Sequence, residues 1–126
     1  GYVDSSVRQA VAERDRANEA LESLRLDLGL RVHKEFRGIT EGILKIRALE
    51  QAVRSADQVV LSNQKSFAAG SRTVVDILNA EQQRSVALRD LAQARHLYLM
   101  SRVRLLALVD GVDTQVMLAL NDSFQN

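Results

Sequence analysis

Few residues in this sequence have the types and spacing that catalysis or metal binding requires. His33 and His96 are single histidines far apart in the chain, no carboxylates accompany them at ligand spacing, and the sequence contains no cysteine. Ser85 and Ser101 show no nucleophile-base arrangement, and no pair of carboxylates resembles that of a glycosidase. The sequence therefore predicts no catalytic residue, no metal site and no cofactor.

The most specific local sequence signal is the stretch AAGSRTVVD, residues 68–76. It interrupts the helical pattern of a chain that contains no proline. Gly70 can adopt the left-handed backbone that ends a helix at low cost. Thr73 and Asp76 fit a capping box, in which the hydroxyl accepts from an amide near Asp76 while the carboxylate lies at the positive end of the next helix. The stretch therefore predicts a turn between two helices. Capping leaves Arg72, at the exposed apex, without a structural role.

The elements that position this turn are predicted to be helical. Hydrophobic residues make up 46% of the 126 residues and aromatic residues only 4%; together with zero proline and many Ala, Leu, Glu, Gln and Arg residues this favours an all-α fold. Apolar residues at steps of three and four predict a long antiparallel helical hairpin with unequal arms, about 4–69 and 73–109. Asp110 and Gly111 predict a stop, and a short helix is expected at about 114–120.

The apolar pattern differs between the two arms. The first arm carries one seam, with a stutter expected between Leu28 and Phe36. Its members are Val3, Val7, Ala10, Ala17, Leu21, Leu24, Leu28, Val32, Phe36, Ile39, Ile43, Ile46, Leu49, Val53, Ala56 and Val60. The second arm carries a first stripe of Ile77, Ala80, Ala87, Leu91, Ala94, Tyr98, Leu105 and Leu108. Beside it lies a second stripe of Leu78, Leu88, Ala92, Leu99, Leu106 and Val109. Two stripes indicate neighbours on two sides, as in a wall of helices.

The unequal arms leave residues 3–28 without a matching helix, because the second arm reaches back only to about Val32. At ~1.5 Å per residue the first helix would be about 100 Å long, which is too extended for a globule of 126 residues. We therefore expect the chain to be incomplete, oligomeric or both, since an exposed apolar stripe of this size associates.

Charge is balanced along the chain. The 17 basic and 16 acidic residues give a formal net charge of +1, which indicates no nucleic-acid partner. No apolar run approaches the ~18 residues of a membrane-spanning helix. Fourteen of the basic residues are arginine, which favours ion-paired helix interfaces. Three ion pairs at i,i+4 are expected, namely Asp27–Arg31, Glu41–Lys45 and Glu50–Arg54.

Three glycines lower the helix propensity of the first predicted arm. Gly29, Gly38 and Gly42 each cost about 1 kcal/mol relative to alanine in a helix interior. We interpret them as weak points or close approaches in a packed helix, with a functional hinge as the alternative.

Several segments carry a family resemblance. FAAGSRTVVDILNAEQQ and LRDLAQARHLYL, followed by LALVDGVD and LALND, resemble segments of the TolC-type outer-membrane channel proteins of drug efflux and type I secretion. Upstream, VDSSVRQA resembles the segment that leads from the last barrel strand into the tunnel helix. The resemblance covers essentially all 126 residues.

The resemblance implies a trimer, in which each full protomer has two repeats of outer-membrane β-barrel strands and a periplasmic helical hairpin. This sequence resembles the second-repeat hairpin: a long helix over 1–69, a tip turn at 70–73, a second helix over 74–109 and an equatorial tail over 110–126. Barrel strands, the first repeat and a signal peptide are then missing, and the membrane is reached only through those strands. The expected location is the periplasmic portion of an outer-membrane protein.

The resemblance also implies site residues at the tip. Gly70, Ser71, Arg72 and Thr73 correspond to the tip that docks the periplasmic adaptor (membrane-fusion) protein. Through the complex, the chain would work with an inner-membrane pump or a secretion ATPase.

A tunnel gate is implied at the same end. Asp76 corresponds to a ring of carboxylates at the tunnel mouth, and Phe67 and Arg72 to residues that help hold the tip closed. Phe67 stands where some members have tyrosine, and Asn79 where some have a second aspartate. These departures predict one ring of carboxylates and weaker block by cations.

The predicted function is therefore a passive exit duct. The alternative is an antiparallel coiled-coil scaffold whose tip binds an unrelated protein, which requires one apolar seam rather than two stripes. The hairpin of an adaptor protein is disfavoured, because adaptor hairpins are flanked by lipoyl-like β segments.

Overall fold

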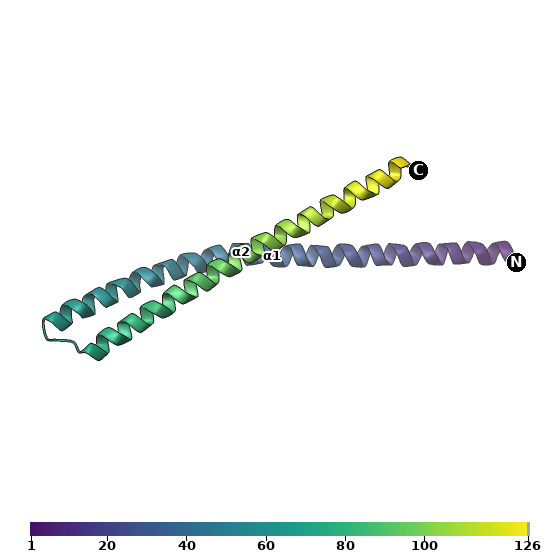
Figure 1. The fold of residues 1–126 in the computed structure, drawn as a ribbon. Coiled ribbons are helices and arrows are strands. Elements are labelled where there is room, and N and C mark those ends of the chain that lie inside the picture. Colours follow the sequence, from purple (N-terminus) through teal and green to yellow (C-terminus); the bar gives the residue numbers. More distant parts are fainter. Residues whose placement is uncertain (126) are drawn as a thin grey trace. The chain divides into compact units, whose positions relative to one another are not determined.

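The computed structural model describes residues 1–125, which form two helices and a turn (Figure 1). Helix α1 spans Tyr2–Ala68 and helix α2 spans Val74–Gln125, and residues 1–125 contain no strand. The predicted all-α hairpin is confirmed. The chain divides into two compact units: residues 35–107, which we call the hairpin unit, and residues 1–34 together with the chain from 108 on.

The hairpin unit is held by one apolar seam between α1 and α2. The seam runs through buried or half-buried positions, which on α1 are 35, 39, 42, 46, 49, 53, 56 and 60 and on α2 are 77, 80, 84, 87, 91, 94, 98, 101 and 105; further half-buried positions, among them 38, 43 and 50 on α1 and 81, 90 and 100 on α2, flank it. Steps of three and four alternate throughout, which is the repeat of a left-handed coiled coil. The most buried apolar side chains are Val60, Ala80, Leu91 and Ala94. The first stripe of the second arm and the seam from Ile39 to Val60 are confirmed.

The predicted stutter is wrong. Val32 and Phe36, which were expected on the seam, are 36% and 56% exposed, whereas Glu35 is only 7% exposed. From Glu35 onward the seam keeps an unbroken heptad repeat, so the charged residue takes the seam position and Phe36 turns outward. Glu35 tolerates this position because the Arg104 guanidinium lies 3.6 Å from its carboxylate.

The predicted stop at Asp110 and Gly111 is also wrong. Helix α2 continues through both residues to Gln125, so the expected helix at 114–120 is part of α2. Gly111 has no positive φ, and the Thr114 hydroxyl donates to the Asp110 carbonyl at 3.0 Å inside the helix. A single glycine costs about 1 kcal/mol, which the helix-forming residues on either side outweigh.

The second stripe lies on the surface of α2. Its large members, Leu78, Leu88, Leu99, Leu106 and Val109, are 40% to 65% exposed. In the other unit, the first half of the predicted α1 seam, including Val3, Val7, Leu21 and Leu24, is exposed as well. Neither face is covered by the described residues. No helix within residues 1–125 has the length and apolar character needed to cross a membrane.

Arginine pairs with carboxylates across the hairpin unit, as its abundance predicted. The guanidinium of Arg84 donates to Asp57, Arg95 lies 3.7 Å from Glu50, and Arg104 lies 3.6 Å from Glu35. The hydrogen bond to Asp57 raises the pKa of the Arg84 guanidinium above its ordinary value. Each of these pairs joins α1 to α2.

One of the three ion pairs predicted within α1 is confirmed. Asp27 and Arg31 pair at 3.0 Å. Glu41 pairs with Arg37 instead of Lys45, at 3.3 Å. Glu50 reaches across to Arg95, and Arg54 donates to the side-chain oxygen of Gln51. The last two predictions are wrong in partner, since Arg37 on the same helix pairs with Glu41 and Arg95 on the other helix pairs with Glu50.

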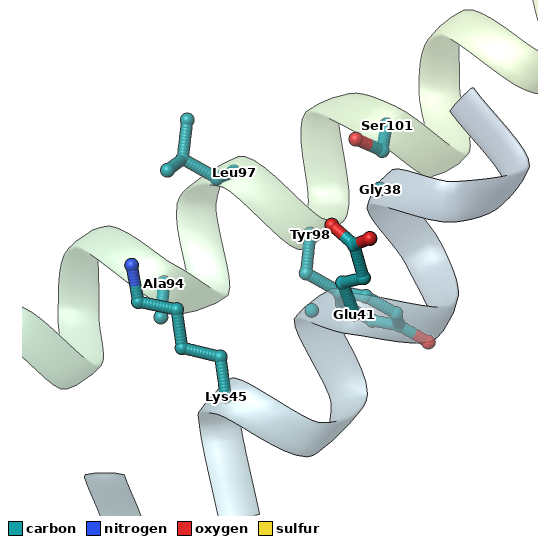
Figure 2. Close-up of a pocket in the computed structure, with 8 residues that line it drawn as sticks. Gly38, Glu41, Lys45, Ala94, Leu97, Tyr98 and Ser101 are labelled. Carbon is teal, nitrogen blue, oxygen red and sulfur yellow. The ribbon is translucent and has the colours of Figure 1, made fainter. Parts of the chain in front are cut away.

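The glycines of α1 fall into two kinds. A Cβ added at Gly38 would lie 2.5 Å from the Ser101 Oγ, and one at Gly42 would lie 3.3 Å from the Tyr98 ring (Figure 2). A Cβ at Gly29 would meet nothing within 4 Å. The interpretation as close approaches is confirmed for Gly38 and Gly42, and Gly29 is a weak point in an exposed stretch of helix.

Candidate functional site

The candidate site is the turn between α1 and α2, where the end of α1 is closed by a glycine. Gly70 has a φ of 83°, the left-handed conformation that glycine adopts without strain. Its amide donates to the Phe67 carbonyl at 2.9 Å, and the Ser71 amide donates to the Ser66 carbonyl at 2.9 Å. These two bonds form a Schellman motif, which satisfies carbonyls at the end of a helix. The Ser71 hydroxyl donates to the Ser66 carbonyl as well, at 3.1 Å.

The start of α2 is closed by the predicted capping box. The Asp76 amide donates to the Thr73 hydroxyl oxygen at 3.3 Å, and the Thr73 amide donates to the Asp76 Oδ2 at 2.9 Å. The Thr73 hydroxyl also donates to Oδ2, at 3.0 Å. Two backbone donors at the helix start are thus satisfied reciprocally. The Ile77 amide donates to the Thr73 carbonyl at 3.3 Å, which continues the helix.

The Asp76 carboxylate is held in its charged form by this geometry. The backbone hydrogen bond from Thr73 lowers the pKa of Asp76 most, the hydroxyl hydrogen bond adds to it, and the nearby positive charge of Arg72 contributes in the same direction. Burial opposes the shift, and its effect on the pKa is larger than that of the Arg72 charge. The carboxylate therefore stays ionised at lower pH than an ordinary aspartate.

The other predicted site residues are exposed around this frame. Gly70, Ser71, Arg72 and Thr73 are all exposed, and Phe67 is 44% exposed at the end of α1. Asn79 is exposed one helical turn after Asp76. The turn therefore brings Phe67, Arg72, Thr73 and Asp76 to one end of the hairpin unit, with a backbone fixed on both sides.

The residues that could have done other chemistry lie elsewhere. His33, Ser85 and His96 are exposed, and Ser101 is buried against Gly38. Residues 1–125 hold no group of three or more His, Cys, Asp or Glu side chains placed to bind a metal ion.

The pairing of the buried Glu35 with the exposed Arg104 was not predicted from the sequence. The missed signal is the spacing of Glu35, which stands seven residues before the half-buried Gly42 and so occupies the same heptad position.

Comparison with known proteins identifies the family. The family model described as "Outer membrane efflux protein" matches residues 1–111. The chain belongs to this family. It is 33% identical over 123 residues to "Outer membrane protein TolC" of Escherichia coli (strain K12), covering 98% of this chain and 25% of that protein.

Two secretion proteins are also similar to this member of the outer membrane efflux protein family. "Proteases secretion protein PrtF" of Dickeya chrysanthemi is 29% identical over 126 residues, which are 100% of this chain and 27% of that protein. "Alkaline protease secretion protein AprF" of Pseudomonas aeruginosa is 33% identical over 105 residues, which are 83% of this chain and 22% of that protein. The chain spans about a quarter of the length of these relatives.

Proposed function

We propose that this chain forms part of the periplasmic wall of an outer-membrane exit duct, in a tripartite efflux pump or a type I secretion system. The observation that carries the proposal is the match to the outer membrane efflux protein family over residues 1–111, which includes the whole turn. Similarity to PrtF and AprF supports a role in secretion. The role is passive: the chain lines a path and catalyses no reaction.

The docking element of this duct is the turn itself. A docking surface binds with less loss of entropy when its backbone is already fixed. The Schellman motif at Gly70 and the capping box at Thr73 fix the backbone on both sides of Ser71 and Arg72, and both side chains are exposed. We propose that this tip docks a periplasmic adaptor protein, and through it an inner-membrane pump or secretion ATPase.

The exposed second stripe supports assembly into a wall. A helix that packs on one neighbour needs one apolar stripe, whereas α2 has a second one on its surface. We propose that this face packs on a neighbouring helix of the duct and that the complete protein is a homotrimer.

The gate of the duct is proposed at Asp76, with Phe67, Arg72 and Asn79 around it. Three copies of this hairpin would bring one ring of Asp76 carboxylates together and no second ring, because position 79 is asparagine. Single-channel recording with Asp76→Asn tests this: we expect weaker block by added cations, and an unchanged sensitivity to cations would reject the gate.

The docking proposal is tested with Arg72→Asp, introduced into the chromosomal gene that encodes this chain. We expect loss of export, measured as cell-associated drug and as secreted protein, at a normal protein level. Arg89→Asp is the matched control, since the Arg89 side chain on α2 is 74% exposed and away from the turn. Normal export with Arg72→Asp at normal protein level would reject docking by this residue.

A photo-crosslinker placed at Ser71 identifies the partner directly. Capture of an adaptor with a lipoyl-like domain supports the duct. Capture of an unrelated protein, with export unaffected by deletion of the gene, favours the alternative of an antiparallel coiled-coil scaffold. The exposed second stripe of α2 argues against that alternative, which requires a single apolar seam.

A further inference from the structure

At the end of the hairpin unit opposite the turn, α1 and α2 approach each other unusually closely. Gly38 and Gly42 lie one helical turn apart, a spacing that puts two positions without side chains on the same face of α1. A Cβ at Gly38 would lie 2.5 Å from the Ser101 Oγ and 3.2 Å from its Cβ. Figure 2 shows Ser101 directly across from Gly38. Ser101 therefore occupies the space that a side chain at position 38 would need.

Tyr98 makes the second contact of this kind. A Cβ at Gly42 would lie 3.3 Å from the Tyr98 Cδ2 and 3.8 Å from its Cα, so side chain and backbone of α2 both come close. The Arg102 guanidinium lies 5.8 Å from the centroid of the Tyr98 ring, within the range of a cation–π interaction. The Tyr98 ring thus lies close both to Gly42 of α1 and to Arg102 of its own helix.

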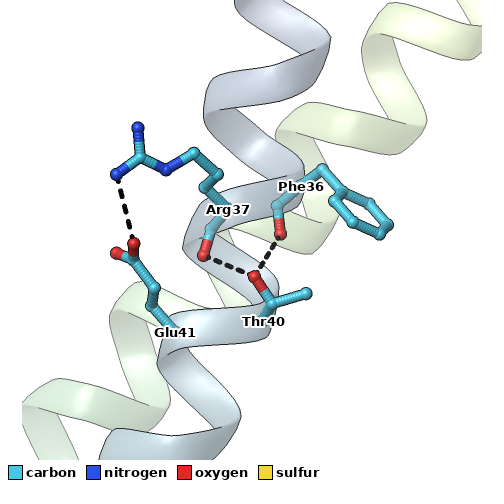
Figure 3. Close-up of polar contacts among 4 residues, drawn as sticks. All are labelled: Phe36, Arg37, Thr40 and Glu41. Carbon is cyan, nitrogen blue, oxygen red and sulfur yellow. Dashed lines mark hydrogen bonds and ion pairs between the residues drawn. The ribbon is translucent and has the colours of Figure 1, made fainter.

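The glycine-containing turn of α1 has its own support. The Thr40 hydroxyl donates to the carbonyls of Phe36 at 3.2 Å and Arg37 at 3.1 Å, and Arg37 pairs with Glu41 at 3.3 Å (Figure 3). These contacts bridge Gly38 on the outer side of the helix. The Arg37–Glu41 pair, at i,i+4, offsets part of the flexibility that two glycines bring to α1.

A buried charge completes this end of the seam. Glu35 is 7% exposed and its carboxylate lies 3.6 Å from the Arg104 guanidinium. Sliding α1 along α2 by one helical turn would separate the pair and leave Glu35 buried without a partner, which is strongly unfavourable. A polar group at a seam position is a known means of specifying helix register.

We propose that these contacts form a register lock, which prevents α1 from sliding along α2 at the end of the hairpin unit opposite the turn. Its members are Glu35, Gly38, Gly42, Tyr98, Ser101 and Arg104. The short turn fixes the register at the other end. With both ends fixed, the two helices of the hairpin unit can bend or rotate but cannot shift past each other. The lock concerns the hairpin alone and does not depend on the proposed duct.

The lock is tested by pulsed electron spin resonance on the full chain, which has no native cysteine to remove. One pair of spin labels, at Arg47→Cys and Gln93→Cys, reports on the lock end. A second pair, at Gln58→Cys and Gln82→Cys, reports on the turn end. All four positions are exposed. Each pair is measured alone and combined with variants of the lock.

We expect Gly38→Ala to shift or broaden the distance distribution of the lock-end pair, because the added Cβ would lie 2.5 Å from the Ser101 Oγ and 3.2 Å from the Ser101 Cβ, closer than the ordinary carbon contact distance of about 3.5–4.0 Å. The turn-end pair should not change. Adding Ser101→Gly to Gly38→Ala should restore the narrow distribution, since both atoms in the way are removed.

The control is Gly29→Ala, where the added Cβ meets nothing within 4 Å and neither distribution should change. If Gly38→Ala does not fold, Arg104→Gln replaces it, because this change removes the partner of Glu35 without adding bulk; it should broaden the lock-end distribution. A lock-end distribution like that of the unchanged protein in the folded variant would overturn the proposal. So would equal broadening at both ends, which indicates general loosening.

Discussion

The turn gives a sharp prediction at Thr73. Replacing Thr73 with alanine removes two of the three hydrogen bonds of the capping box, namely the one its hydroxyl accepts from the Asp76 amide and the one it donates to Oδ2. The amide of residue 73 can still donate to Asp76. Loss of a threonine cap costs about 1 kcal/mol of helix stability. That energy corresponds to about a fivefold change in an equilibrium constant.

Hydrogen exchange measured by NMR checks this prediction. In Thr73→Ala, the amides of Asp76 and Ile77 should exchange about fivefold faster than in the unchanged chain, because opening of the first turn of α2 becomes easier. Thr73→Ser keeps the hydroxyl and should exchange at nearly the original rate. The amide of Leu91, in the middle of the seam, should be unaffected. Equal exchange rates for Asp76 and Ile77 in Thr73→Ala and Thr73→Ser would refute the cap.

Four further predictions concern the turn, the seam and the exposed Gly111 of α2. The pKa of Asp76 in the folded chain lies below its ordinary value of 3.8. The ionised carboxylate therefore contributes its full stabilisation above pH 3.8, and this contribution is lost as the pH falls through the lower folded pKa. In an NMR titration, the pKa of Asp76 should be lower in the unchanged chain than in Thr73→Ala. Asp57→Asn should lower the urea midpoint of unfolding at low salt and much less at 1 M NaCl, because the pair with Arg84 is half exposed and screened. Gly70→Ala should destabilise the end of α1 by about 1–2 kcal/mol, because its φ is positive, whereas Gly111→Ala should increase helicity by circular dichroism.

The turn could be predicted from the sequence because its chemistry is local. Gly70, Thr73 and Asp76 act on backbone groups within a few residues, so their types and spacing are sufficient. The first stripe of α2 could also be predicted, since a helix with one buried side repeats at a fixed spacing.

The buried position of Glu35 could not be predicted in the same way. A carboxylate is assigned to the surface unless a partner is known, and its partner Arg104 lies on the other helix. The prediction therefore places the apolar Val32 and Phe36 on the seam, although the actual heptad repeat continues through Glu35. The stop at Gly111 failed for a related reason: glycine signals a helix end only when it adopts a positive φ, which depends on the residues around it.

The apolar and capping patterns of the sequence do not identify the roles of exposed residues. Arg72 and Asn79 make no contribution to the capping of either helix. The exposed apex already allowed docking as a role for Arg72, whereas only the family resemblance suggested a role for Asn79. The second stripe shows the same limit, because an apolar pattern indicates that a face is covered but does not identify the covering partner.

The capping box has a consequence for any ligand that approaches Asp76. One oxygen of its carboxylate, Oδ2, accepts both bonds from Thr73. A proton or cation that draws this oxygen away must also loosen the first turn of α2. By thermodynamic reciprocity, whatever tightens that turn makes the carboxylate harder to neutralise. The stability of the first turn of α2 and the negative charge of Asp76 are therefore coupled. A partner that changes one of them also changes the other.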